Sequence, residues 1–343
     1  MKLQTALFSL VAALATNAAL AYDWQALPEQ APAPADNPTT PEKIELGRML
    51  YFDPRFSKTG TVSCNSCHNL MLGGDDNRPV SMGVHGQMGG RSAPTVWNSA
   101  FASSQFWDGR AATLEEQAKG PVVNPVEMGM SDVENAMDRV RAIPGYKPYF
   151  VKAFGDKDPL TVDNAAKAVA AFERAMITPN SPYDRFVKGD KSALSAQQQR
   201  GMQTFADIGC VSCHSGAAFN GPSMPAGTGF FMKFPTFTDN DYVKQYDLMK
   251  DKGRFDVTKK DADMHLFKVP TLRNIALTAP YFHNGSVKTL DEAVRVMAKT
   301  QLNKNLDDEQ VADIAAFLNG LTGEFPQQTL PRLPATDGWA LGN

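Results

Sequence analysis

Two short stretches, Cys64-Asn65-Ser66-Cys67-His68 and Cys210-Val211-Ser212-Cys213-His214, decide how this 343-residue chain folds. Each has the pattern C-x-x-C-H, which is typical of covalent attachment of a c-type haem. The two thiols can form thioethers to one porphyrin, and the histidine that follows can ligate its iron. One match could arise by chance, from a redox-active cysteine pair or from half of a zinc site. Two matches that use all four cysteines of the chain favour two covalent haem c groups.

The N-terminus predicts export of the chain. Lys2 supplies a positive charge, residues 3–20 are apolar, and Ala19-Leu20-Ala21 has the small-x-small pattern of a signal peptidase site. A membrane anchor is the alternative, but the strongly apolar core is short for a spanning helix. We therefore expect residues 1–21 to be a cleaved signal peptide. A periplasmic location and a mature chain without a membrane span follow from it.

Composition limits the classes of protein that the chain can belong to. It has 34 Lys and Arg against 37 Asp and Glu, a net charge of −3, and loss of Lys2 makes the mature protein about −4. This balance lacks the basic surplus of nucleic-acid-binding proteins, so we expect no nucleic acid as a partner. The length favours two domains of ordinary size.

The chain also matches itself at an offset of 176 residues. Residues 93–116 fall on residues 269–292 without a gap, and nine of these 24 positions are identical, which is too many for chance. The chain is therefore predicted to be a duplicated haem domain.

The predicted fold is mostly α, with two tandem cytochrome c-like domains whose long loops each surround one covalent c-type haem. Amphipathic or capped helical patterns occur in corresponding places of the two halves, at residues 41–51, 161–177, 195–205 and 306–321. Prolines and glycines interrupt the helical pattern over residues 178–191. We therefore expect a first domain over residues 22–180 and a second over 181–343. The tail from about residue 322 is free to pack back on the first domain.

One mismatch in the repeat carries chemical information. Met297 of the second half falls on Pro121 of the first half, and it lies eight residues inside the predicted helix 289–301. A methionine there could ligate the second iron, whereas proline cannot ligate iron; the alternative is a core methionine, as for most of the fifteen in the chain. A His/Met iron has a high potential, and an iron without that ligand has a lower one. This asymmetry favours catalysis at the first haem.

His85 is a candidate sixth ligand of the first haem. It lies seventeen residues after His68 in a loop, residues 81–90, that contains four glycines. Such a loop could bring His85 onto the iron and later carry it away. The alternative is an exposed loop histidine, and Met82 and Met88 of the same loop are rival ligands.

Peroxide cleavage at a haem needs a group that moves a proton between the two oxygens. Glu127 is a candidate because it closely follows Pro121, and Gln117 could orient the bound peroxide. The alternative for Glu127 is an ordinary surface or capping carboxylate. Trp107 is either a core aromatic residue or an electron relay between the haems.

Over essentially its whole mature length the chain resembles the bacterial di-haem cytochrome c peroxidases. The resemblance rests on the His85 loop, the Met297 helix and the segments CNSCHN, APTVWN, FWDGRAATLEEQ, NPVEM, CVSCH, VPTLRN and APYFHNGSVKTLDEAV. It implies reduction of hydrogen peroxide to water with two electrons from a small soluble donor, a cytochrome c or a cupredoxin. It also implies a homodimer.

The resemblance further implies roles for individual residues. His68 and His85 would ligate the low-potential haem in the resting form, and His214 and Met297 the high-potential haem. Reduction of the second haem would release His85. Glu127 and Gln117 match the distal acid/base and its partner, and Trp107 matches the tryptophan between the haems.

A calcium ion at the domain junction is also implied by the resemblance. Two of its ligands are backbone carbonyls that match Thr278 and Pro280. The third ligand in the family is an asparagine, and this chain has Ser92 at that position. Calcium accepts varied oxygen ligands, so a carbonyl or a water could replace the amide.

Two rival functions remain open on the sequence. A di-haem electron-transfer cytochrome would explain both haem motifs, but it would not explain Pro121. A di-haem oxidase acting on a protein substrate, similar to the enzyme that matures a tryptophan-derived quinone cofactor, would carry a tyrosine where this chain has Met297.

Overall fold

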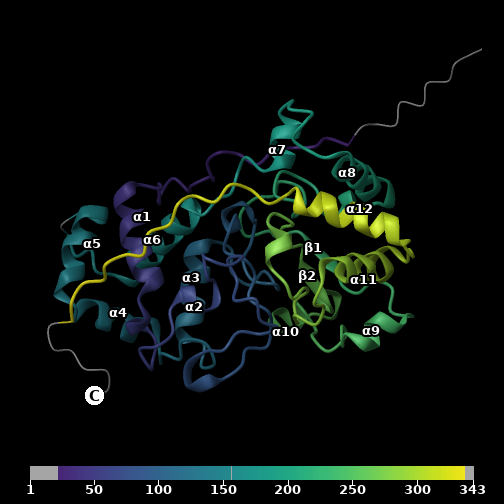
Figure 1. Cartoon of the computed structure of the whole chain (residues 1–343). Coiled ribbons are helices and arrows are strands. Elements are labelled where there is room, and N and C mark those ends of the chain that lie inside the picture. Colours follow the sequence, from purple (N-terminus) through teal and green to yellow (C-terminus); the bar gives the residue numbers. More distant parts are fainter. Residues whose placement is uncertain (1–21, 156, 337–343) are drawn as a thin grey trace, which may run out of the picture.

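Helices dominate the computed structural model, which describes residues 22–155 and 157–336 (Figure 1). The predicted signal peptide, residues 1–21, lies outside the described residues. Within the described part of the chain, no helix combines the length and the apolar character that a membrane span requires. The five helices predicted from the sequence are present, with ends that differ by at most three residues from those expected. They are α1 (Pro41–Phe52), α6 (Val162–Ala175), α8 (Ala196–Ile208), α11 (Leu290–Leu302) and α12 (Asp308–Asn319).

Each half is built on a pair of crossed helices. In the first half α1 crosses α6 at Gly47, where a side-chain methyl would overlap the carbonyl oxygen of Ala168. In the second half α8 crosses α12 at Gly201, where a methyl would overlap the carbonyl oxygen of Asp313. A glycine at each crossing lets the two backbones approach closely. The remaining helices of the first half are α2 (Cys64–Cys67), α3 (Leu114–Val123), α4 (Val133–Arg141) and α5 (Lys147–Phe154).

The second half contains a small sheet that the sequence did not predict. Strands β1 (Phe231–Lys233) and β2 (Leu266–Lys268) pair antiparallel, with Phe231 opposite Lys268. The short helices of this half are α7 (Pro182–Val187), α9 (Asp241–Gln245) and α10 (Phe255–Thr258). Three residues a strand are too few to show the alternation of apolar and polar residues by which strands are recognised.

Similar backbone turns recur in the two halves. Phe106 and Phe282, which are 176 residues apart, both adopt a left-handed conformation, with φ of 68° and 70°. Each opens a tight turn closed by an isolated antiparallel bridge, Gln105 to Ala111 in the first half and Tyr281 to Val287 in the second. Helices α3 and α11 follow these turns, and each begins with a capping threonine, Thr113 or Thr289.

Equivalent asparagines join the halves through the linker. Asn98 donates to the Thr178 hydroxyl oxygen at 2.8 Å and accepts from the Thr178 backbone N–H at 2.9 Å. Asn274, the repeat counterpart of Asn98, donates to the same hydroxyl oxygen at 2.9 Å. All three side chains are buried. Thr178, at the start of the linker, is therefore hydrogen-bonded to an asparagine from each half.

The two ends of the described chain pack on opposite halves (Figure 1). Trp24 lies in an aromatic cluster of the second half with Tyr183 and Phe317, although it precedes the first half in sequence. After α12 the chain runs back across the first half. There Arg48 donates to the Thr329 hydroxyl at 3.1 Å, and Arg55 donates to the Pro334 carbonyl oxygen at 2.8 Å.

Candidate functional site

The first C-x-x-C-H stretch lies on the wall of a cavity in the first half. Cys64 and Cys67 stand at the two ends of α2, and His68 follows directly. The Nδ1 atom of His68 lies 2.9 Å from the carbonyl oxygen of Pro94, which orients the ring. Burial lowers the pKa of His68, so its imidazole is neutral and Nε2 is available as a ligand.

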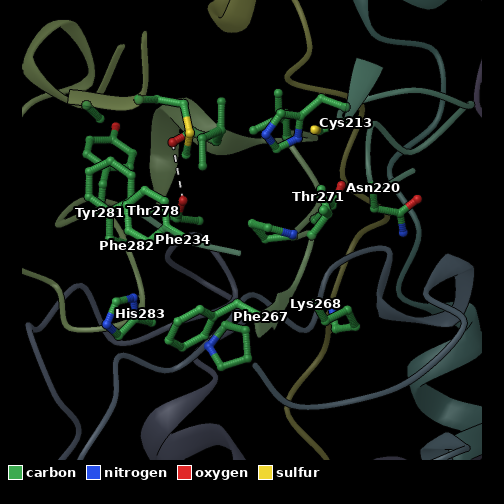
Figure 2. A pocket seen from close by; sticks show the side chains of 18 of the residues that line it. Cys213, Asn220, Phe234, Phe267, Lys268, Thr271, Thr278, Tyr281, Phe282 and His283 are labelled. Atoms are coloured by element: carbon green, nitrogen blue, oxygen red, sulfur yellow. Dashed lines mark hydrogen bonds between the residues drawn. The ribbon is translucent and has the colours of Figure 1, made fainter. Parts of the chain in front are cut away.

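The second stretch occupies the corresponding place in the second half. Cys210, Cys213 and His214 line its cavity, and His214 Nδ1 lies 3.0 Å from the carbonyl oxygen of Phe219. The other walls are largely apolar. Figure 2 shows aromatic rings gathered on one side of this cavity and Cys213 on the other; the labelled rings are those of Phe234, Phe267, Tyr281 and Phe282.

The chemistry of the cysteines fits covalent haem better than a bound metal ion. Burial raises the pKa of Cys64 to about 12, of Cys67 to about 11 and of Cys210 to about 12, so these thiols are neutral. Among the described residues, no group of three or more His, Cys, Asp or Glu side chains is placed to hold a metal ion. Two thiols and one neutral histidine on an apolar cavity match the needs of haem c.

Met297 and Pro121, the mismatched pair of the repeat, lie on equivalent helices and each lines the cavity of its own half. Met297 lies on α11 and lines the second cavity together with His214. Pro121 lies on α3, the counterpart of α11, and lines the first cavity together with His68. A thioether therefore faces one cavity, where the other has only a proline ring.

Polar groups surround Pro121 in the first cavity. Gln117, Asn124 and Glu127 all line this cavity. The Asn124 amide donates to Glu127 Oε1 at 2.7 Å. Burial raises the pKa of Glu127, while the charge of Arg110 and the hydrogen bond from Asn124 oppose the shift.

Arg110 is a cavity residue that the sequence reasoning did not single out. It lines the first cavity, and its guanidinium lies 3.4 Å from the centre of the Phe106 ring. Asp108 accepts from Arg110 at 2.8 Å and so limits the motion of the guanidinium. Arg110 directly follows the repeated F-x-x-G pattern, and this position in the sequence could have indicated it.

His85 does not line either cavity. It is exposed at the tip of the short helical turn Val84–Gly86, in a left-handed conformation with φ of 58°. The loop is nevertheless docked beside Glu127, because the buried Val84 donates its N–H to the Glu127 carbonyl oxygen at 2.8 Å. The Gln87 amide adds a bond to the Pro125 carbonyl oxygen at 3.2 Å. The rival ligands Met82 and Met88 are also exposed, and they pair with each other at the base of the loop.

The comparisons with known proteins agree with this architecture. A family model for di-haem cytochrome c peroxidase matches residues 41–192. The cytochrome c551 peroxidase of Nitrosomonas europaea is 45% identical over 307 residues, which cover 89% of this chain and 87% of that protein. The chain belongs to the di-haem cytochrome c peroxidase family.

Two further relatives of this family show how far the similarity extends. The cytochrome c551 peroxidase of Pseudomonas aeruginosa is 43% identical over 316 residues, covering 90% of this chain and 87% of that protein. A solved structure of a MauG-like protein associated with microbial copper homeostasis has a TM-score of 0.75 at 32% identity. It covers 89% of this chain and 96% of that chain. Membership in a di-haem family implies two haem c groups in this chain.

The two haem cavities of this family member share a wall. Trp107 lines both, and its indole N–H donates to the Ser92 carbonyl oxygen at 2.9 Å. The Ser92 N–H in turn donates to the carbonyl oxygen of His283 at 2.7 Å. His283 is the repeat counterpart of Trp107, so the backbone of Ser92 is bonded by equivalent residues of the two halves.

The three residues expected at a calcium ion lie on the wall of one cavity. Ser92, Thr278 and Pro280 all line the second cavity. The carbonyl oxygen of Ser92 accepts from Trp107 and keeps a second lone pair, and the residue also carries a hydroxyl oxygen. The Asn77 amide donates to the carbonyl oxygens of residues 277 and 279, which alternate with those of Thr278 and Pro280. The oxygens present suit calcium by type, since it takes carbonyl and hydroxyl ligands.

Glu173 and Lys268 line the cavities, and burial shifts the pKa of each toward its neutral form. Sequence reasoning missed both residues. Glu173 lies on α6 and lines the first cavity, and burial raises its pKa to about 8. Lys268 lines the second cavity, where burial lowers its pKa to about 8. Both lie next to repeated segments, and comparing the two halves position by position could have found them.

Proposed function

We propose that this chain reduces hydrogen peroxide to water in the periplasm with electrons from a small cytochrome c or a cupredoxin. The observation that carries the proposal is the inequality of two equivalent cavities. The second cavity is lined by Met297 and a neutral histidine, whereas the first is lined by Pro121 and polar side chains. One haem then stores an electron, and the other has a face open to peroxide.

Haem, when bound, supplies the iron at which peroxide is reduced and to which electrons are delivered. Glu127 supplies the proton movement. Its Oε1 is held by Asn124, which leaves Oε2 to take a proton from one peroxide oxygen and return it to the other. Gln117 lies in the same cavity and orients the substrate. The balance is one peroxide, two electrons and two protons for two waters.

We assign the axial ligands as His68 and His85 for the first haem at rest, and as His214 and Met297 for the second. We further propose that His85 leaves the first iron on activation, and in the structure its loop is exposed and does not line the first cavity. Trp107 then serves as the relay, because its indole lines both cavities. A calcium ion at Ser92, Thr278 and Pro280 and a homodimeric assembly complete the proposal.

Peroxide turnover by the half-reduced holoenzyme tests the proposal. A reduced small cytochrome c is supplied as donor, and its oxidation is followed after addition of hydrogen peroxide. Steady turnover at a first haem that is high-spin in the half-reduced form is expected. Absence of turnover would leave an electron-transfer cytochrome, and a tyrosinate ligand on the second haem would favour an oxidase acting on a protein.

A further inference from the structure

The feature of interest is an isolated carboxyl group in the first cavity. Glu173 is only 6% exposed, and its side chain lines the cavity from α6. Its Oε2 atom is buried and has no hydrogen-bond partner among the described residues. Within the same part of the chain, Glu173 forms no ion pair. Buried carboxylates are normally paired, so an unpaired one needs an explanation.

The groups that face Glu173 do not compensate its charge. Cys64 and Tyr51 lie close enough that the negative charge of Glu173 raises the pKa of both. The neighbouring Arg174 is ion-paired with Glu115 of α3. Arg174 favours ionisation of Glu173 and Glu115 opposes it, and burial outweighs both. Since Cys64 becomes a thioether when haem is attached, it adds no charge.

In the second half, the position that corresponds to Glu173 carries no carboxyl group. Phe172 of α6 corresponds to Phe317 of α12, so Glu173 corresponds to Leu318. Leu318 is buried and lines the second cavity, as Glu173 lines the first. The same place on two equivalent helices therefore carries a leucine beside one haem and a carboxyl beside the other. Packing alone does not require the carboxyl, because leucine fills the place in the second half.

A buried carboxyl without a hydrogen-bond partner responds strongly to nearby charge. It is neutral unless a positive charge offsets the cost of burying its negative charge. The charge that changes in this cavity is that of the haem iron, which falls by one when an electron arrives. A carboxyl without a fixed partner can follow that change by taking up a proton.

We propose that Glu173 is a redox-linked proton site of the first haem. Glu173 takes a proton from solvent when the first haem gains an electron from the donor, and it returns the proton when that electron leaves. One O–H bond forms on reduction and breaks on oxidation, so the charge of the cavity stays constant. The inference rests on the proposed function only in placing the first haem in this cavity.

The pH dependence of the two haem potentials tests this role. Spectroelectrochemical titration of the holoenzyme over about pH 6 to 9 should show the first-haem potential falling as pH rises. The slope should approach about 59 mV per pH unit, since one proton then accompanies one electron. In Glu173→Gln the slope should be lost over the same range. The second haem, read in the same sample, is the internal control, and its slope should be unchanged by the substitution.

Leu318→Glu provides the reciprocal variant. It should make the potential of the second haem depend more steeply on pH than it does in the unchanged protein. A Glu173→Gln variant with intact spectra and an unchanged first-haem slope would overturn the inference, as would equal changes at both haems. Peroxide turnover is measured separately on the same samples. If the unchanged protein turns over peroxide but Glu173→Gln keeps the first-haem slope, only the proposed proton site is refuted. If Glu173→Gln loses the slope but the unchanged protein does not turn over peroxide, the peroxidase function is refuted and the proton site stands.

Discussion

Gly83 lets the His85 loop dock against the turn that carries Glu127. A methyl group at Gly83 would lie 2.1 Å from the Val126 carbonyl oxygen and 2.5 Å from that of Glu127. The φ of Gly83 is −102°, which alanine adopts freely, so the obstacle is steric. Gly83→Ala should therefore separate the loop from the turn without straining its own backbone.

The size of the effect follows from these distances. Ordinary contact begins at 3.4 Å, so the two segments must separate by roughly 1.3 Å. The bond from the Val84 N–H to the Glu127 carbonyl oxygen, now 2.8 Å, would then be lost. Such overpacking typically costs about 1–3 kcal/mol of stability. A misplacement of about 1 Å at a catalytic group can lower the rate about 100-fold, and we expect a loss of that order in kcat.

Steady-state peroxide turnover with a reduced cytochrome c donor measures this loss, and visible spectra check that both haems remain attached. Gly89→Ala is the matched control in the same loop, because its methyl would lie 3.5 Å from the Ser81 carbonyl oxygen, an ordinary contact. The control should retain activity. If Gly83→Ala turned over peroxide as fast as Gly89→Ala, docking of the loop would not position Glu127.

Glu127→Gln should lower kcat about 10²–10⁴-fold, because the amide cannot carry the proton; an unchanged rate would exclude the role of Glu127. Burial raises the pKa of Glu127 and the Arg110 charge opposes this shift, so Arg110→Gln should move the acid limb of kcat/KM to higher pH. A limb that stays in place would contradict this coupling. His85→Gly should leave the first haem high-spin and active without prior reduction, and an unchanged low-spin spectrum would indicate another ligand. Gly201→Ala should destabilise the second half by about 1–3 kcal/mol in urea titrations, because the methyl overlaps the Asp313 carbonyl; an unchanged midpoint would contradict the close crossing of α8 and α12.

Much of the helical framework could be predicted because its signals are local. The caps and apolar periodicity of α1, α6, α8, α11 and α12 lie within each segment, and the structure has these helices close to the predicted ends. The pair β1 and β2 was missed because each strand is short and gains its hydrogen bonds from a partner about 35 residues away. The docking of Trp24 on the second half was missed for the same reason, since nothing near Trp24 in sequence indicates it.

The candidate site divides in a similar way. The two attachment motifs can be recognised without a structure, because two thiols and a histidine within five residues can meet one porphyrin whatever the rest of the chain does. The sequence also determined the inequality of Met297 and Pro121, because the repeat register aligns them without a structure.

Tertiary structure alone decided which other groups face the haem cavities. Glu173 is about 105 residues from His68 in sequence, and only the crossing of α1 and α6 brings its carboxyl to the same cavity. The exposed position of His85 depends on docking of its loop beside Glu127, 42 residues later. Covalent chemistry within one turn of chain is a local property, whereas the burial and charge of a side chain depend on how distant segments pack.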